Sequence, residues 1–155
     1  MLQLISYKKI LLTSICFIST LVLADNIGDI VEHSGDSGIV RDGTKTVIKG
    51  AVDEDIFFKD SIETATGRMK IEFVDETKLS LTEHTEVIID EYYFDSDPSK
   101  SKMALNFVSG TARFTTGRLG LVPKENIVIT TPTATIGVRG TDFTTSVDEL
   151  GRSLV

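Results

Sequence analysis

The most informative segment of the chain reads Thr131-Pro132-Thr133-Ala134-Thr135-Ile136-Gly137-Val138-Arg139-Gly140-Thr141-Asp142-Phe143. It follows the strand-like run Ile127-Val128-Ile129 and sets apolar residues between threonines and glycines. Because proline and glycine interrupt regular strand pairing, the pattern predicts a strand, a sharp bend and a second strand. The segment contains no nucleophile–base pair and no cluster of metal ligands, so we expect its role to be architectural.

Short runs with period-two alternation continue this pattern along the chain. The expected strands are residues 69–73, 79–81, 87–89, 103–108, 112–114, 127–129 and 136–138. Ser109-Gly110 is expected to end the strand before it, and residues 144–147 and 152–155 are expected to form a hairpin. Alternation without a convincing amphipathic helix indicates an all-β domain. Residues 62–68 resemble residues 129–133, a weak repeat of the kind found in solenoids.

The first 24 residues have the three parts of a secretory signal. Lys8 and Lys9 supply the positive charge, residues 10–23 are almost uncharged and apolar, and Ala24 is a small residue at the expected cleavage point. The apolar run is shorter than the about 20 residues of a membrane-spanning helix, so we expect a cleaved signal peptide at residues 1–24. One domain is expected at residues 25–155. Because Val155 falls inside the second strand of the expected hairpin, truncation at this end stays an open alternative.

The cysteine content and the net charge limit the compartment in which the protein is expected and the classes of partner that it can bind. The only cysteine, Cys16, lies in the signal segment after Ile15, so we expect neither a disulfide nor a lipid anchor in a periplasmic or secreted protein. The net charge of −7 becomes −9 once Lys8 and Lys9 are removed. Repulsion makes nucleic acids and anionic membranes poor partners, so membrane contact is expected only through an uncleaved signal segment.

Candidate chemical sites are few, and we expect no enzyme, no cofactor and no metal site. Asp53-Glu54-Asp55 and Asp95-Ser96-Asp97 lack the ligand spacing of a calcium loop, which favours solvated acidic turns. His33 and His84 are isolated in polar surroundings and are expected at the surface. Arg139 is a candidate for bidentate binding of a ligand carboxylate. The favoured interpretation is that it pairs with an internal acid or with backbone carbonyls at the bend.

The chain resembles the FecR-like domain family, named for an inner-membrane regulator of iron–siderophore signalling in Gram-negative bacteria. The resemblance starts near Ile27-Gly28-Asp29-Ile30-Val31 and is strongest at Thr131-Pro132-Thr133-Ala134, Ile136-Gly137-Val138-Arg139-Gly140-Thr141 and Phe143. One departure is Glu76, where the family often has glycine after the aspartate. The fold implied by the resemblance is a twisted β-solenoid or sandwich-like all-β domain.

The family's function is expected to transfer only in part. FecR-type regulators carry a cytoplasmic helical segment that binds a sigma factor, followed by a membrane helix and the periplasmic region. Only residues 1–9 precede the apolar run here, so sigma-factor regulation is not expected. We expect a non-catalytic envelope module that docks a protein partner through a sheet edge.

Two alternatives stay open at this point. One is a protein that binds envelope glycans, with Tyr92-Tyr93-Phe94 stacking on sugar rings, although core packing is the favoured role for these aromatics. The other is a membrane-anchored signal-relay component of the FecR type, which requires the signal segment to be retained.

Overall fold

The computed structural model describes residues 25–48, 53–138 and 142–155, and the signal segment lies outside these ranges. The described residues are all-β, with three short 3-10 turns and no α-helix. The strands are β1 (Gly28–Ser34), β2 (Ser37–Arg41), β3 (Thr44–Ile48), β4 (Glu54–Ile56), β5 (Ser61–Thr64), β6 (Arg68–Phe73), β7 (Lys78–Leu81), β8 (Glu86–Tyr93), β9 (Lys102–Thr115), β10 (Ile127–Thr130), β11 (Thr135–Gly137), β12 (Asp142–Val147) and β13 (Ser153–Leu154). The turns are η1 (Pro98–Lys100), η2 (Arg118–Leu121) and η3 (Lys124–Asn126).

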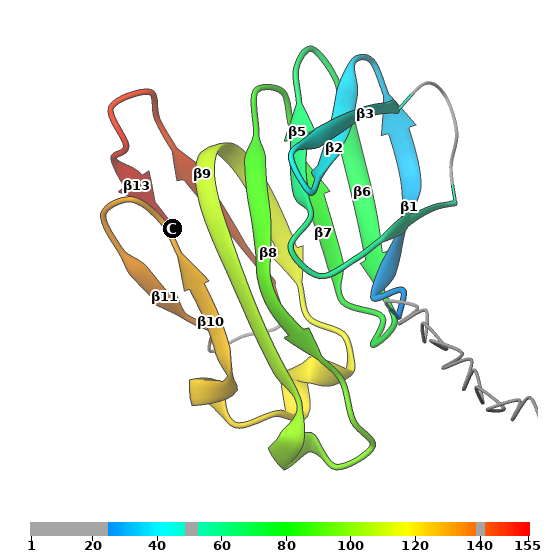
Figure 1. Cartoon of the computed structure of the whole chain (residues 1–155). Coiled ribbons are helices and arrows are strands. Elements are labelled where there is room, and N and C mark those ends of the chain that lie inside the picture. The colour runs from blue at the N-terminus through cyan, green and yellow to red at the C-terminus, as the bar shows by residue number, and fades with distance from the viewer. Residues whose placement is uncertain (1–24, 49–52, 139–141) are drawn as a thin grey trace, which may run out of the picture.

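The strands form one continuous sheet that curls into a half-barrel (Figure 1). Its main path runs β3-β2-β5-β8-β9-β7-β6-β1-β4, and every pair on this path is antiparallel. The remaining strands branch from β9, with β10 parallel to its first half and β12 antiparallel to its second half. The all-β prediction is confirmed, whereas neither a solenoid nor a sandwich is confirmed.

Strand β9 joins the two halves of the sheet. Its first half pairs with β8 and β10, and its second half pairs with β7 and β12. The change of partners occurs at Gly110, whose φ of +86° is a left-handed conformation that favours glycine. A Cβ on Gly110 would overlap the Cα of Thr85, so the two backbones touch here. The prediction that Ser109-Gly110 ends a strand was therefore wrong, because the glycine bends one long strand instead.

Apolar side chains from both halves of the sheet fill the inside of the curl. Ile30, Ile71 and Leu79 from one half and Ile89 and Leu105 from the other are fully buried. The expected alternation accounts for this, since strands β6, β7 and β8 each bury every second residue along much of their length. Burial of apolar surface is the main stabilising contribution to such a domain.

Turn chemistry explains two of the connections. Asp42-Gly43 joins β2 to β3, and both residues have positive φ, as a two-residue hairpin turn requires. Between β6 and β7, Glu76 has a φ of 70°. Glutamate therefore holds a left-handed conformation that usually favours glycine.

Candidate interaction surfaces

The signature segment forms a hairpin that is tied to the last hairpin of the chain. Strands β10 and β11 pair across a turn at Pro132-Thr133, which agrees with the predicted strand, bend and strand. The Thr131 hydroxyl accepts from the Ala134 amide at 3.0 Å and from the Ser153 hydroxyl at 2.7 Å. The Thr133 hydroxyl donates to the Gly151 carbonyl at 3.1 Å. These threonines thus connect two hairpins, and the 144–147 and 152–155 hairpin is present as β12 and β13.

The apolar members of the segment pack on the core. Val138 is buried, and Ile136 and Phe143 contact the core from partly buried positions. The rings of Phe143 and Phe114 lie 5.3 Å apart between centroids. A Cβ on Gly137 would meet no atom within 4 Å, so no close contact requires glycine at this position. Arg139, Gly140 and Thr141 lie outside the described residues, so the proposed roles of Arg139 stay predictions.

The histidines and acidic triplets are not brought together. His84 is exposed in the turn before β8, as expected. His33 is half-buried and both of its ring nitrogens are enclosed, so the surface position expected for it was wrong. Glu54 and Asp55 belong to β4 rather than to a loop. Asp97 caps η1 by accepting from the Ser99 amide at 3.1 Å. Within the described ranges, no group of three or more His, Cys, Asp or Glu residues converges as metal ligands would.

An apolar hollow of about 520 Å³ lies where β8 ends, against the turns that follow β4 and β6. We call it the aromatic groove and define it by Phe58, Val74, Tyr92, Tyr93 and Phe94. Phe58, Val74 and Tyr93 are 47%, 46% and 52% exposed, which is unusual for large apolar side chains in one hollow. The sequence indicates the groove in part, because the aromatic run Tyr92-Tyr93-Phe94 is a candidate for stacking on a ligand.

Tyr92 belongs to the support of the groove rather than to its open surface. Its ring stacks on Phe73 at 5.1 Å, and its hydroxyl donates to Asp75 Oδ1 at 2.8 Å. Burial raises the pKa of Tyr92, and the hydrogen bond to the Asp75 carboxylate raises it further. The core-packing interpretation is thus confirmed for this tyrosine.

Asp75 is a buried carboxylate that connects its own turn to β8 and η2 at the base of the groove. Besides Tyr92, it accepts from the Thr77 hydroxyl at 2.5 Å and from the Leu119 amide at 3.0 Å. Buried carboxylates are stable when their oxygens are hydrogen-bonded in this way. These hydrogen bonds connect β8, the turn between β6 and β7, and η2 beneath the groove.

A smaller hollow of about 330 Å³ shares Phe94 with the groove. Leu121 lines it and is 79% exposed. The Arg118 guanidinium lies 4.7 Å from the centroid of the Phe94 ring, a cation–π distance. Arginine, aromatic and aliphatic side chains together are the composition of many protein interfaces.

Of the open sheet edges in the described part of the chain, β3 is the longest. It pairs only with β2, and Val47 on it is 54% exposed. Lysines often protect such edges, but Lys45 forms an ion pair with Glu63 on β5, on the far side of β2. Strand β3 is thus an open edge, and docking of a partner at a sheet edge stays a prediction.

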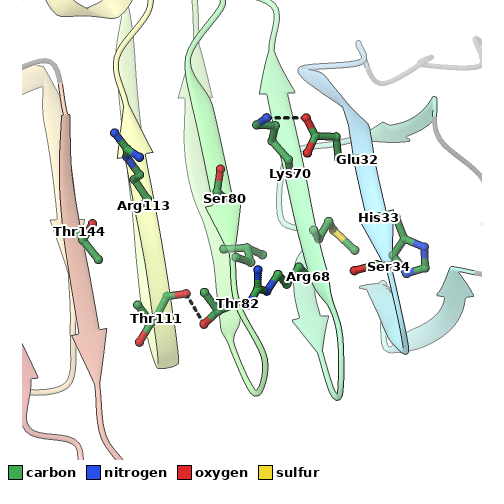
Figure 2. Close-up of a pocket in the computed structure, with 12 residues that line it drawn as sticks. Glu32, His33, Ser34, Arg68, Lys70, Ser80, Thr82, Thr111, Arg113 and Thr144 are labelled. Atoms are coloured by element: carbon green, nitrogen blue, oxygen red, sulfur yellow. Dashed lines mark hydrogen bonds and ion pairs between the residues drawn. The ribbon is translucent and has the colours of Figure 1, made fainter.

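A polar hollow of about 600 Å³ lies on the outward face of β1, β6, β7, β9 and β12 (Figure 2). Its lining carries several hydroxyls and the cations Arg68, Lys70 and Arg113. It shares no residue with the aromatic groove.

Comparison with known proteins identifies the family. A family model described as FecR protein matches residues 60–155. The chain belongs to the FecR family. No curated protein and no solved structure matches it. The matched region runs from the end of the turn before β5 to Val155, so β1–β4 precede it although they belong to the same sheet.

FecR is a regulatory, non-enzymatic family associated with envelope signalling. FecR domains are typically periplasmic. Among the described residues, the structure contains no helix with the length and apolar character needed to cross a bilayer.

Proposed function

We propose that this FecR-like domain is a non-catalytic protein-interaction module of the bacterial envelope, and that the aromatic groove is its docking surface. The observation that carries the proposal is the gathering of Phe58, Val74 and Tyr93 around one hollow, each about half exposed. Aromatic side chains of this kind often contribute most of the binding energy at protein interfaces.

The charge around the groove indicates the kind of partner. Asp25 and Glu91 are exposed on its rim. Lys59 lies over the Phe58 ring and Arg118 over the Phe94 ring, so charges of both signs surround it. A complementary segment of another protein therefore carries an apolar or aromatic anchor with charged residues beside it. Charges of this kind steer the encounter and select the partner more than they add to affinity.

Selection from a displayed peptide library tests this proposal and reveals the sequence that the groove prefers. Peptides are selected on residues 25–155 and measured by calorimetry against native protein, Phe58→Ala, Tyr93→Ala and the control Lys124→Ala. The expected peptides combine an apolar anchor with charged flanks and lose at least about tenfold in affinity on each groove variant, or about 1.4 kcal/mol. Peptides that bind the native protein and both groove variants equally would overturn the assignment.

The proposal places the domain in the periplasm or outside the cell, after removal of residues 1–24. Mass spectrometry of the exported protein tests this point directly. A chain that starts at Asp25 supports a released module. A chain that still starts at Met1 contradicts it and favours the anchored relay component.

A further inference from the structure

The polar hollow in Figure 2 is built by strand register rather than by a loop. Glu32 of β1 pairs with Lys70 of β6, which pairs with Ser80 of β7. Ser80 in turn pairs with Arg113 of β9, and Arg113 pairs with Thr144 of β12. Five neighbouring strands thus place one polar side chain each in a row across the sheet. Neighbouring strands lie about 4.8 Å apart, so the row offers closely and regularly spaced polar groups.

The hollow has more positive than negative charge, although the chain as a whole is acidic. Arg68, Lys70 and Arg113 line it together with a single acid, Glu32. Lys70 forms an ion pair with Glu32. Arg113 forms a bidentate ion pair with Asp142, which is not part of the lining. Both ion pairs are substantially exposed, so a competing anion can replace the carboxylate at a small cost in free energy.

Arg68 is the exception among these cations. It makes no ion pair with any carboxylate of the described residues, which include every aspartate and glutamate of the chain. Figure 2 shows its side chain extended toward Thr82, over the next strand. In a chain with 23 acidic residues against 16 basic ones, a guanidinium left without a partner leaves an open position for an anion.

Five other lining residues are serines or threonines, whose hydroxyls can both donate and accept. Ser34, Ser80 and Thr144 make no side-chain hydrogen bond to the described residues, and Ser80 lies near the middle of the view in Figure 2. Sugar hydroxyls need partners of this two-way kind. Within the described part of the chain, no Phe, Tyr or Trp lines the hollow, so it lacks the stacking platform that holds neutral sugars.

From this arrangement we propose that the polar hollow binds an acidic oligosaccharide, with a uronate carboxylate on Arg68 and sugar hydroxyls on Ser80 and Thr144. The guanidinium presents two parallel N–H donors that match a carboxylate. The hydroxyls of the neighbouring strands then meet the ring hydroxyls across the sheet. This site goes beyond the proposed docking of a protein, since the two surfaces share no residue. The glycan site proposed here is therefore the polar hollow and not Tyr92-Tyr93-Phe94.

Calorimetric titration of residues 25–155 with an oligogalacturonate of four units tests the site. Neutral maltotetraose, monomeric galacturonate and inorganic phosphate are titrated in parallel. The expected result is saturable binding of the oligogalacturonate, at least about tenfold tighter than that of each of the other three, and weaker at high salt. Absence of oligogalacturonate binding, or equal binding of maltotetraose, would overturn the proposal. Equal affinity for phosphate or for the monomer would also overturn it, because the site would then recognise only an oxyanion.

Variants locate the binding on this face. Arg68→Gln is expected to lower the affinity at least about tenfold, and Arg68→Lys is expected to recover only part of it because the two-pronged geometry is lost. Lys124→Gln removes one exposed charge elsewhere and is expected to change nothing. Arg68 points outward, so unchanged thermal unfolding confirms that each variant is folded. Equal binding by Arg68→Gln and native protein would contradict the assignment.

Discussion

Tyr92 and Tyr93 are adjacent tyrosines that donate to different aspartates, and they allow a sharp test of the structure. The Tyr92 hydroxyl lies 2.8 Å from the buried Asp75, whereas the Tyr93 hydroxyl lies 3.0 Å from Asp95 in an exposed pair. Tyr92→Phe keeps the ring stacked on Phe73 and removes one hydrogen bond to a charged group. Such a bond contributes about 1.5–3 kcal/mol, and the lower value applies because the ring is only half-buried.

Asp75 retains two donors in Tyr92→Phe, so the variant remains folded. A loss of about 1.5 kcal/mol lowers the Tm of a domain of this size by about 6 °C. The assay is thermal unfolding followed by circular dichroism, with Tyr93→Phe as the matched control. That control is expected to leave the Tm unchanged, because its hydroxyl is exposed to water. Equal shifts in the two variants, or a more stable Tyr92→Phe, would show that the buried hydrogen bond is not formed as described.

Three further predictions address pH and backbone conformation. Because the pKa of Tyr92 is raised in the folded state above about 10, its stabilising contribution is complete below about pH 10 and is lost as the pH rises further. Urea unfolding between about pH 9 and 11 is therefore expected to show a smaller alkaline loss in Tyr92→Phe than in native protein, and an equal loss would contradict this. Gly110→Ala is expected to cost about 3 kcal/mol or more in urea unfolding, since its Cβ would overlap the Thr85 hydroxyl at a positive φ. Glu76→Gly is expected to be as stable as native protein or up to about 1 kcal/mol more stable, because glycine adopts the positive φ of this position without strain. Glu76→Ala is expected to be less stable than Glu76→Gly. Thermal unfolding of the two variants checks this order.

Alternation predicted the central strands well, because one face of each is buried and the other is not. Strands β6, β7 and β10 agree with the expected residues to within one or two positions. Strands β1–β5 were not assigned individually, although Asp42-Gly43 is a strong hairpin signal that marks the β2–β3 turn. The role of Gly110 could not be read locally, because its bend depends on contact with Thr85, 25 residues earlier in the chain.

The candidate surfaces were less predictable than the strands. Phe58, Val74 and Leu121 come from three separate turns, and no periodic pattern marks an apolar side chain that remains exposed. The polar hollow could be anticipated in part, since the alternation at residues 68–73 places Arg68 and Lys70 on the outward face. Its full extent requires the order of five strands in the sheet, which residue pattern alone does not determine.

The shared strand β9 makes the two halves of the sheet a single mechanical unit. Neither half can open without breaking backbone hydrogen bonds of β9, which pairs with four other strands. Local opening of one half is therefore suppressed, and amide hydrogens along β9 exchange only when the whole domain unfolds.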